Sequence, residues 1–191
     1  MKLHIRLLTL SILLSVIACS STPVDTTQDS SDYFNQHAEL MRVMEKTASV
    51  EAPDELFQAV FADFDTTMTE ENLRKLYSDD VYFNDTFVTL NGIDELVVYM
   101  AKTSEQVIAS EVQIVDLAKS DSDYYIRWVM QVEFDARGKR IKSRSIGMTQ
   151  LRFNSEGKVV LHQDFWDSAN AFYQHLPVIG GLVKRVKNGL H

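Results

Sequence analysis

The chain has 191 residues, 45 % hydrophobic and 24 % charged, with few Gly or Pro, which suffices for one globular domain with a real core. Its formal net charge is −8, which argues against nucleic-acid binding, because phosphates need basic surfaces. The single cysteine excludes an internal disulfide.

Residues 1–18 are typical of a secretory signal peptide. Lys2 and Arg6 give a positive start, and residues 7–17 form an apolar segment too short to span a bilayer. Loss of these two cations lowers the formal charge of the mature chain from −8 to −10. Cys19 follows Ala18 in a pattern that resembles a bacterial lipobox, which implies cleavage before Cys19, lipidation of that residue and anchoring by its acyl chains. The alternative is an ordinary signal peptide with a coincidental cysteine.

The residue after Cys19 bears on the expected location. Ser20, rather than Asp, at this position resembles lipoproteins sent to the outer membrane. That resemblance implies a protein of the bacterial cell envelope that faces the periplasm.

The next segment is expected to be a tether followed by helices. Residues 19–31 are rich in Ser, Thr and Asp without an apolar period, which predicts a flexible tether before a domain over 32–167. Helical spacing predicts a first helix from Asp32 to about Thr47. Pro53 opens a second helix whose apolar face carries Phe57, Phe61 and Phe64. Thr69 is the expected N-cap of a third, short helix.

Strand-like segments dominate the second half of the chain. A short strand over 81–84 and a helix over 93–104 precede four strand-like runs over 110–118, 123–134, 141–153 and 158–167. Gly157 supplies the positive φ for a tight turn between the last two. Helices first and strands later predict an α+β fold, in which an antiparallel sheet carries helices on one face.

The last strand carries the candidate site. Alternation places Val159, Leu161, Gln163 and Phe165 on one face and Val160, His162, Asp164 and Trp166 on the other, and both faces should be covered. A His and a carboxylate beside a Trp suggest a pocket wall with a few polar groups. The alternative is a hydrogen-bonded pair that fills a half-buried sheet. The five scattered His residues predict no metal site.

Residues 168–191 form a basic amphipathic tail. Val178, Leu182 and Val186 share one helical face, and Lys184, Arg185 and Lys187 add three positive charges without a nearby acid. Such a helix can lie on anionic lipid. More often it packs its apolar face on its own domain, which is the expectation here.

Three stretches, Tyr77–Asp85, Asn91–Leu96 and Leu151–Trp166, resemble the nuclear transport factor 2-like (NTF2-like) superfamily in its SnoaL-like branch. The resemblance extends over about residues 53–167. It implies a cone-shaped, strongly curved, mostly antiparallel sheet wrapped around N-terminal helices that enclose a pocket. Many members dimerise through the outer sheet face, which implies a homodimer through Leu161 and Phe165.

Three groups of relatives carry specific residues onto this chain. In ketosteroid isomerases the catalytic base falls on Asp85, while the two oxyanion donors fall on Phe61 and Thr149, which cannot supply strong acidic donors. In limonene-type epoxide hydrolases the water-positioning residues fall on Tyr82 and Asn84 and the catalytic Asp on Asp164. The accompanying Arg and Asp fall on Gln131 and Glu133. SnoaL-like cyclases place an acid/base residue at Asp164 as well.

These observations predict a lipid-anchored domain that binds a small, largely apolar molecule without a cofactor. One hypothesis is a hydrolase or isomerase that uses acid/base chemistry, and the other is a non-catalytic binding or accessory lipoprotein. The candidate catalytic residues are Asp164, Tyr82, Asn84, Asp85 and Glu133. The candidate ligand-binding residues are His162, Trp166, Phe57, Phe61, Thr149 and Gln131.

Overall fold

The computed structural model describes residues 27–44, 49–136 and 138–190. It divides the chain into two compact units, residues 1–43 and 44–191, each of which is described by itself. The expected signal peptide, Cys19 and most of the expected tether lie outside the described residues. Within the described ranges, no helix combines the length and the apolar character needed to cross a membrane.

The described part of the first unit is one helix, α1 (Thr27–Val43). It begins five residues before the expected start at Asp32, so the last part of the predicted tether is helical. Neither Gly nor Pro interrupts residues 24–43, so the sequence contains no residue that would stop the helix there. The unit that contains the sheet begins after this helix, at Met44.

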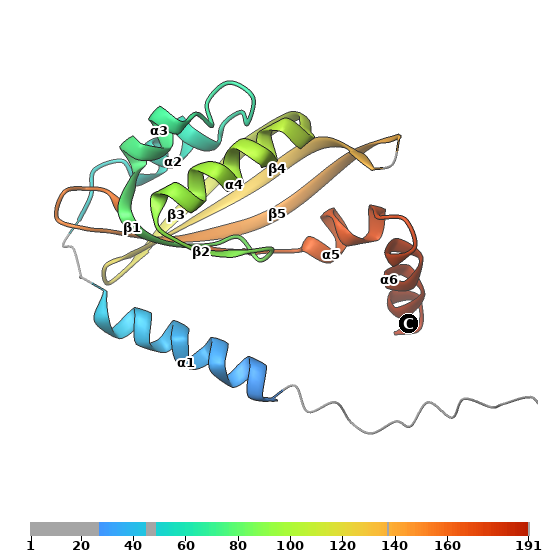
Figure 1. Cartoon of the computed structure of the whole chain (residues 1–191), viewed down its shortest axis with the longest axis horizontal. Coiled ribbons are helices and arrows are strands. Elements are labelled where there is room, and N and C mark those ends of the chain that lie inside the picture. Colours follow the sequence, from blue (N-terminus) through green and yellow to red (C-terminus); the bar gives the residue numbers. More distant parts are fainter. Residues whose placement is uncertain (1–26, 45–48, 137, 191) are drawn as a thin grey trace, which may run out of the picture. The chain divides into compact units, whose positions relative to one another are not determined.

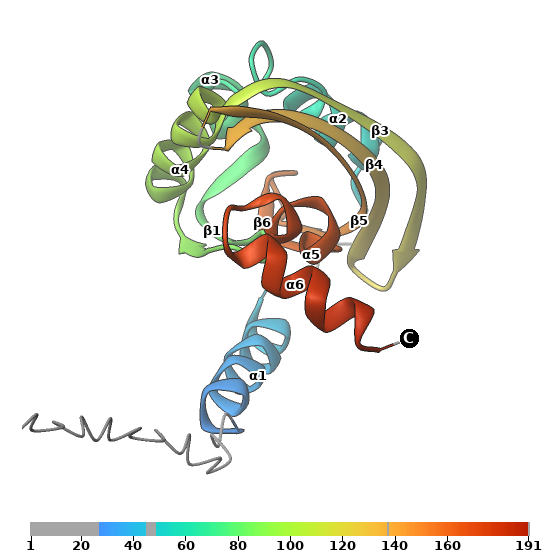
Figure 2. The same ribbon diagram turned by 90° about the vertical axis from the view of Figure 1, so that its right-hand side faces the viewer.

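The second unit is built on one six-stranded sheet in the order β2-β1-β6-β5-β4-β3. β1 and β6 run parallel, and the other neighbours are antiparallel. The sheet curves strongly without closing (Figure 2), which confirms the predicted α+β cone. The strands are β1 (Tyr77–Asn84), β2 (Thr89–Asn91), β3 (Val107–Ser120), β4 (Asp123–Ala136), β5 (Lys139–Phe153) and β6 (Val159–Trp166).

Three helices, α2 (Pro53–Phe61), α3 (Glu70–Leu76) and α4 (Ile93–Gln106), lie together over one face of this sheet (Figure 1). The predicted cap of α3 is present, because Thr69 Oγ1 accepts a hydrogen bond from the Asn72 amide at 3.2 Å. Phe64 lies beyond the end of α2. Apolar side chains of the three helices pack with the strands into one core, which includes Phe57, Leu73, Leu96, Ile126, Leu151 and Phe153.

The β5–β6 hairpin shows the predicted turn and one departure from simple alternation. Gly157 has a φ of 77°, and its amide donates to the Asn154 carbonyl at 3.0 Å. Phe153 pairs with Val159 but Arg152 pairs with Leu161, so Val160 is an extra residue at a bulge. Val159 therefore packs in the core with Phe153, and regular alternation starts at Leu161.

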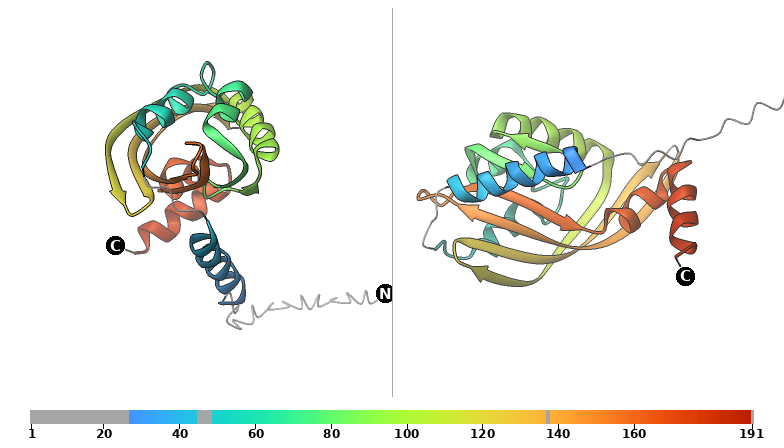
Figure 3. Two further views of the ribbon diagram at one scale, coloured as in Figure 1. Left: turned by 90° about the vertical axis from the view of Figure 1, so that its left-hand side faces the viewer. Right: turned by 90° about the horizontal axis from the view of Figure 1, so that it is seen from below.

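The C-terminal segment continues directly from β6 through α5 (Ser168–Ala171), a short 3-10 helix η1 (Tyr173–His175) and α6 (Ile179–Asn188), as Figure 3 shows on its right. The expectation that α6 packs its apolar face on the domain is wrong: Val178 is 88 % exposed and Leu182 63 %. The contact face is Gly180, because a Cβ there would lie only 2.2 Å from the Gln174 carbonyl oxygen. The helix thus packs through its smallest residue, and the side chains of Leu182 and Val186 face water, while Val183 is half-buried.

Candidate functional site

A cavity of about 1010 Å³ lies between the concave face of the sheet, α2, α4 and the C-terminal segment. Its wall is mostly apolar and aromatic, with a few polar groups, which is the usual composition of a small-molecule site. Six of the predicted residues line it: Phe57, Phe61, Asp85, Thr149, Asp164 and Trp166.

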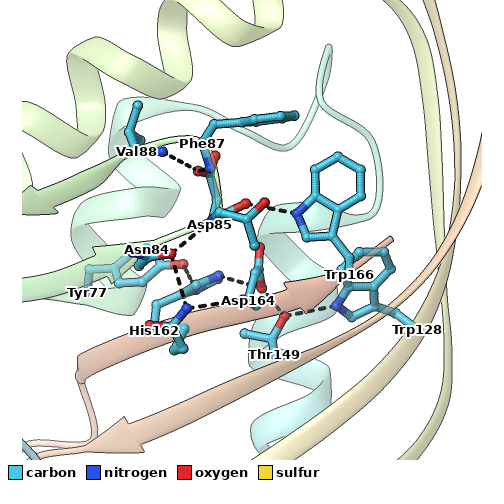
Figure 4. A network of polar contacts seen from close by, with 12 residues as sticks. Tyr77, Asn84, Asp85, Phe87, Val88, Trp128, Thr149, His162, Asp164 and Trp166 are labelled. Atoms are coloured by element: carbon cyan, nitrogen blue, oxygen red, sulfur yellow. Dashed lines mark hydrogen bonds and ion pairs between the residues drawn. The ribbon is translucent and has the colours of Figure 1, made fainter. Parts of the chain in front are cut away.

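The polar centre of the cavity is the carboxylate of Asp164 on β6. Its Oδ1 accepts a hydrogen bond from Thr149 Oγ1 at 2.5 Å and lies 3.1 Å from His162 Nε2 (Figure 4). Trp128 Nε1 in turn donates to Thr149 Oγ1 at 2.9 Å. Among the described residues Oδ2 has no hydrogen-bond partner, so one carboxylate oxygen is available to a molecule in the cavity.

His162 lies behind Asp164 and does not line the cavity, so its predicted ligand-binding position is wrong. Its ring is 1 % exposed because Phe57, Phe61 and Phe83 surround it, with the Phe83 centroid 4.5 Å away. The Tyr77 hydroxyl lies 2.7 Å from Nδ1. Both sequence interpretations of the His–Asp pair hold in part, since the two are hydrogen-bonded and Asp164 also forms the pocket wall.

One assignment of protons satisfies the whole network. His162 donates its Nε2–H to Asp164 Oδ1, and its Nδ1 accepts from the Tyr77 hydroxyl. Burial, together with the nearby charge of Asp164, raises the pKa of Tyr77 well above its ordinary value, so this tyrosine stays a hydrogen-bond donor. Two chains of hydrogen bonds, one through His162 and one through Thr149, therefore end at the Asp164 carboxylate.

Asp85 is occupied by contacts within the protein. Its Oδ1 accepts from the amides of Phe87 and Val88 at 2.9 and 3.0 Å, and its Oδ2 accepts from the Tyr99 hydroxyl. Burial and this hydrogen bond raise the pKa of Tyr99. The Asp85 carbonyl accepts from Trp166 Nε1 at 2.8 Å. Asp85 thus holds a loop in place, and both of its carboxylate oxygens are already used.

Tyr82 and Asn84 lie away from the cavity, which corrects their expected place beside Asp164. Phe83 pairs with His162 and lines the cavity, whereas Tyr82 and Asn84 pair with Leu161 and Gln163 on the other face of the sheet. Asn84 Oδ1 accepts from Gln163 Nε2 at 3.1 Å.

Gln131 and Glu133 on β4 also lie outside the cavity, contrary to expectation. Between residues 128 and 134 the cavity-lining positions of this strand are Trp128, Met130, Val132 and Phe134, so the residues between them face the other side, and Asp135 and Ala136 line the cavity at the end of the strand. Gln131 donates to Glu111 at 3.3 Å, and Glu133 pairs with Arg140 and Lys142.

The sequence interpretation missed part of the wall. The alternation of Trp128, Met130, Val132 and Phe134 is visible in the sequence and could have revealed the β4 contribution. Ser143 and Ser145 on β5 line the cavity as well, and Ser143 Oγ donates to the Ala171 carbonyl at 2.5 Å. Phe172, Leu176, Pro177 and Ile179 close one end. No simple periodicity could have identified these last four.

Among the described residues no group of His, Cys, Asp and Glu could hold a metal ion.

This fold is shared with solved structures of the NTF2-like class. The chain is similar to a provisionally assigned SnoaL-like polyketide cyclase from Shewanella denitrificans, with a TM-score of 0.55, 16 % identity and coverage of 63 % of this chain and 94 % of that one. For a hypothetical protein with a ketosteroid isomerase-like fold from Catenulispora acidiphila, in complex with trimethylamine, the TM-score is 0.55 and the identity 17 %, with coverage of 68 % of this chain and 96 % of that one. For an LEH-like epoxide hydrolase from M. tuberculosis the TM-score is 0.52 and the identity 13 %, with coverage of 71 % of this chain and 96 % of that one. At these identities the likeness shows the NTF2-like cone fold.

The sequence also places the chain in a family, which is a smaller group of proteins than those that share the fold. Residues 54–162, more than half of the chain, match the family described as "Uncharacterized conserved protein (DUF2358)", and the chain belongs to that family. No curated protein matches the sequence.

Proposed function

We propose that the cavity binds a small, largely apolar molecule and that Asp164 accepts and returns a proton during its conversion, without a cofactor. One observation carries the proposal: Asp164 Oδ1 receives two protein contacts while Oδ2 is open to an otherwise mostly apolar cavity. A carboxylate held in this way has a fixed orientation, and its free oxygen can approach a bound molecule.

The surrounding residues favour proton transfer at carbon, as in an isomerisation or cyclisation, over epoxide hydrolysis. Epoxide opening needs an acid that protonates the leaving oxygen, and Glu133, the residue expected for this role, lies outside the cavity. Asp85 already accepts three hydrogen bonds through its carboxylate, and the other acids that line the cavity, Glu105 and Asp135, are exposed. Asp164 is therefore the carboxylate best placed to act alone as a base and then as an acid.

A non-catalytic binding protein is the second candidate. Two hydroxyls at the cavity wall are committed to protein acceptors: Ser143 donates to the Ala171 carbonyl and Tyr99 donates to Asp85. A developing negative charge on a substrate oxygen needs strong, aimed donors. Their commitment elsewhere favours a site that binds without turnover.

The variant Asp164→Asn separates the two candidates, because it keeps volume and hydrogen bonding but removes the base. Loss of a general base should lower turnover about 10²- to 10⁴-fold, while binding measured by native mass spectrometry stays unchanged. The assays use enolisable ketones and epoxides, and Glu133→Gln is the matched control outside the cavity. Undiminished turnover in Asp164→Asn contradicts the proposed chemistry. Retained binding without turnover in the parent protein identifies a carrier.

We also propose the cellular context and assembly expected from the sequence: a lipid anchor on Cys19 in the bacterial outer membrane, facing the periplasm, and a homodimer through the outer sheet face. Support for the dimer comes from Ile146 and Phe165, which are 67 % and 45 % exposed. Met148, two residues from Ile146, pairs with Phe165. Leu161 is fully buried, so the apolar outer surface centres on Ile146 and Phe165 instead of Leu161.

A further inference from the structure

Helix α6 and the residues at its two ends expose an apolar stripe. At about 100° per residue, side chains spaced by four residues fall on one side of a helix. Leu182 and Val186 follow this spacing within α6, Val178 and Leu190 continue it just outside the two ends of the helix, and all four are more than half exposed. A soluble surface helix normally buries such a stripe against its domain, and here the stripe faces away from it.

The charges of α6 are opposite to those of the chain as a whole. Lys184 and Arg185 are exposed and Lys187 is half-buried, whereas residues 168–191 contain no Asp or Glu. The complete chain nevertheless carries a net charge of −8. A cationic helix with an exposed apolar stripe on an acidic protein is complementary to an anionic lipid surface. Pairing of two α6 helices would instead bring like charges together.

Close packing holds α6 against η1, which leads into one end of the cavity. Gly180 lies against the Gln174 carbonyl so tightly that a Cβ would come within 2.2 Å. Leu176, Pro177 and Ile179, at the junction of η1 and α6, line the cavity. Figure 2 shows α5 and α6 in front of the open side of the curved sheet. A surface bound by α6 therefore lies at this end of the cavity.

We propose that α6 is a membrane-docking helix that lies in the interface of an anionic bilayer. Its apolar stripe enters the acyl boundary, Lys184 and Arg185 stay at the headgroups, and the η1–α6 end of the cavity faces the lipid. This docking does not depend on the proton transfer proposed for Asp164.

Tryptophan quenching tests the docking on the full chain. The variant Val186→Trp places an indole in the stripe, and Val98→Trp places one at an exposed position of α4 as the control. Relative to the parent chain, which already contains Trp128 and Trp166, vesicles of phosphatidylglycerol with brominated acyl chains should add quenching in Val186→Trp and none in Val98→Trp. Brominated phosphatidylcholine vesicles should quench the indole at 186 much less. Equal quenching of the two positions, or none at 186, overturns the proposal.

Charge reversal in the Val186→Trp background tests the electrostatic part. Each cation near an anionic surface contributes roughly a fivefold gain in binding, so Lys184→Glu with Arg185→Glu should weaken vesicle-dependent quenching at least about 25-fold. The matched control is Lys139→Glu with Arg144→Glu, which changes the same charge at exposed positions of β5 and should have little effect. An equal effect of the two pairs contradicts docking through α6. A fluorescence shift at 186 that grows with protein concentration without vesicles identifies a second copy as the occupant and overturns the lipid proposal.

Discussion

Replacement of Gly147 by Ala should disturb the wall of the cavity through Trp128. Gly147 on β5 pairs with Trp128 on β4 and with Trp166 on β6. A Cβ at residue 147 would lie 2.3 Å from two carbon atoms of the Trp128 indole ring. Such a separation is far inside van der Waals contact, and the ring is rigid, so Trp128 must move as a whole.

The expected loss of stability has two sources. Insertion of a methyl group into a packed site costs about 1–3 kcal/mol. Movement of the indole also breaks the 2.9 Å hydrogen bond from Trp128 Nε1 to Thr149, which contributes about 0.5–1.5 kcal/mol. Together these give roughly 2–4 kcal/mol, or a fall in Tm of about 4–16 °C for a chain of this size.

Urea unfolding with near-ultraviolet circular dichroism measures both stability and the tryptophan environment. The control is Gly181→Ala in α6, where a Cβ meets nothing within 4 Å and where Ala should stabilise the helix by up to about 1 kcal/mol. In a Trp128→Phe background the smaller ring leaves room, so Gly147→Ala should cost at least about 1 kcal/mol less. The reasoning fails if the cost is the same in both backgrounds or if Gly147→Ala is as stable as Gly181→Ala.

Three further predictions concern the buried network, the anchor and the dimer. Because the folded-state pKa of Tyr77 is raised, its contribution to stability is complete below the unfolded pKa of about 10 and is lost as the pH rises above that value. Tyr77→Phe should therefore flatten the alkaline decline in the free energy of unfolding measured with urea. An unchanged decline would refute this. Cys19→Ser should yield an uncleaved or soluble form in cell fractionation, and normal processing into membranes would exclude the anchor. Phe165→Glu should convert a dimer to a monomer in light scattering, unless the parent is already monomeric at micromolar concentration.

Local signals in the sequence predicted most elements of the sheet unit. Thr69 caps α3 as expected, and Gly157 turns the chain between β5 and β6 with positive φ. The three-residue strand β2 was missed because it is too short to show a period. The extra residue at Val160 was missed because a bulge depends on the pairing register between two strands, which a single strand pattern does not contain.

The same difference between a pattern within one strand and the register between strands explains which site residues were predicted correctly. Asp164 and Trp166 follow from alternation in one strand, and both line the cavity. The residues carried over from relatives on β1 and β4 were placed on the wrong face, since a one-residue difference in register reverses every side chain. On β4 the apolar set from Trp128 to Phe134 marks the inner face and leaves Gln131 and Glu133 outside. The alternation of apolar residues within each strand therefore predicted the cavity-facing positions better than the residues carried over from relatives did.

Successive residues of β6 and of the segment that follows it have different roles in the site. His162 is buried beneath the cavity, Asp164 faces the cavity, and Trp166 fixes the loop of Asp85 through the 2.8 Å hydrogen bond to its carbonyl. Asp167 then caps α5, because its Oδ1 accepts from the Asn170 amide at 3.0 Å. The same short stretch thus orients the carboxylate and starts the segment that leads to α6 (Figure 3). Because η1 and the start of α6 line the cavity that Asp164 faces, a membrane bound at α6 would lie at the end of the cavity formed by the direct continuation of β6.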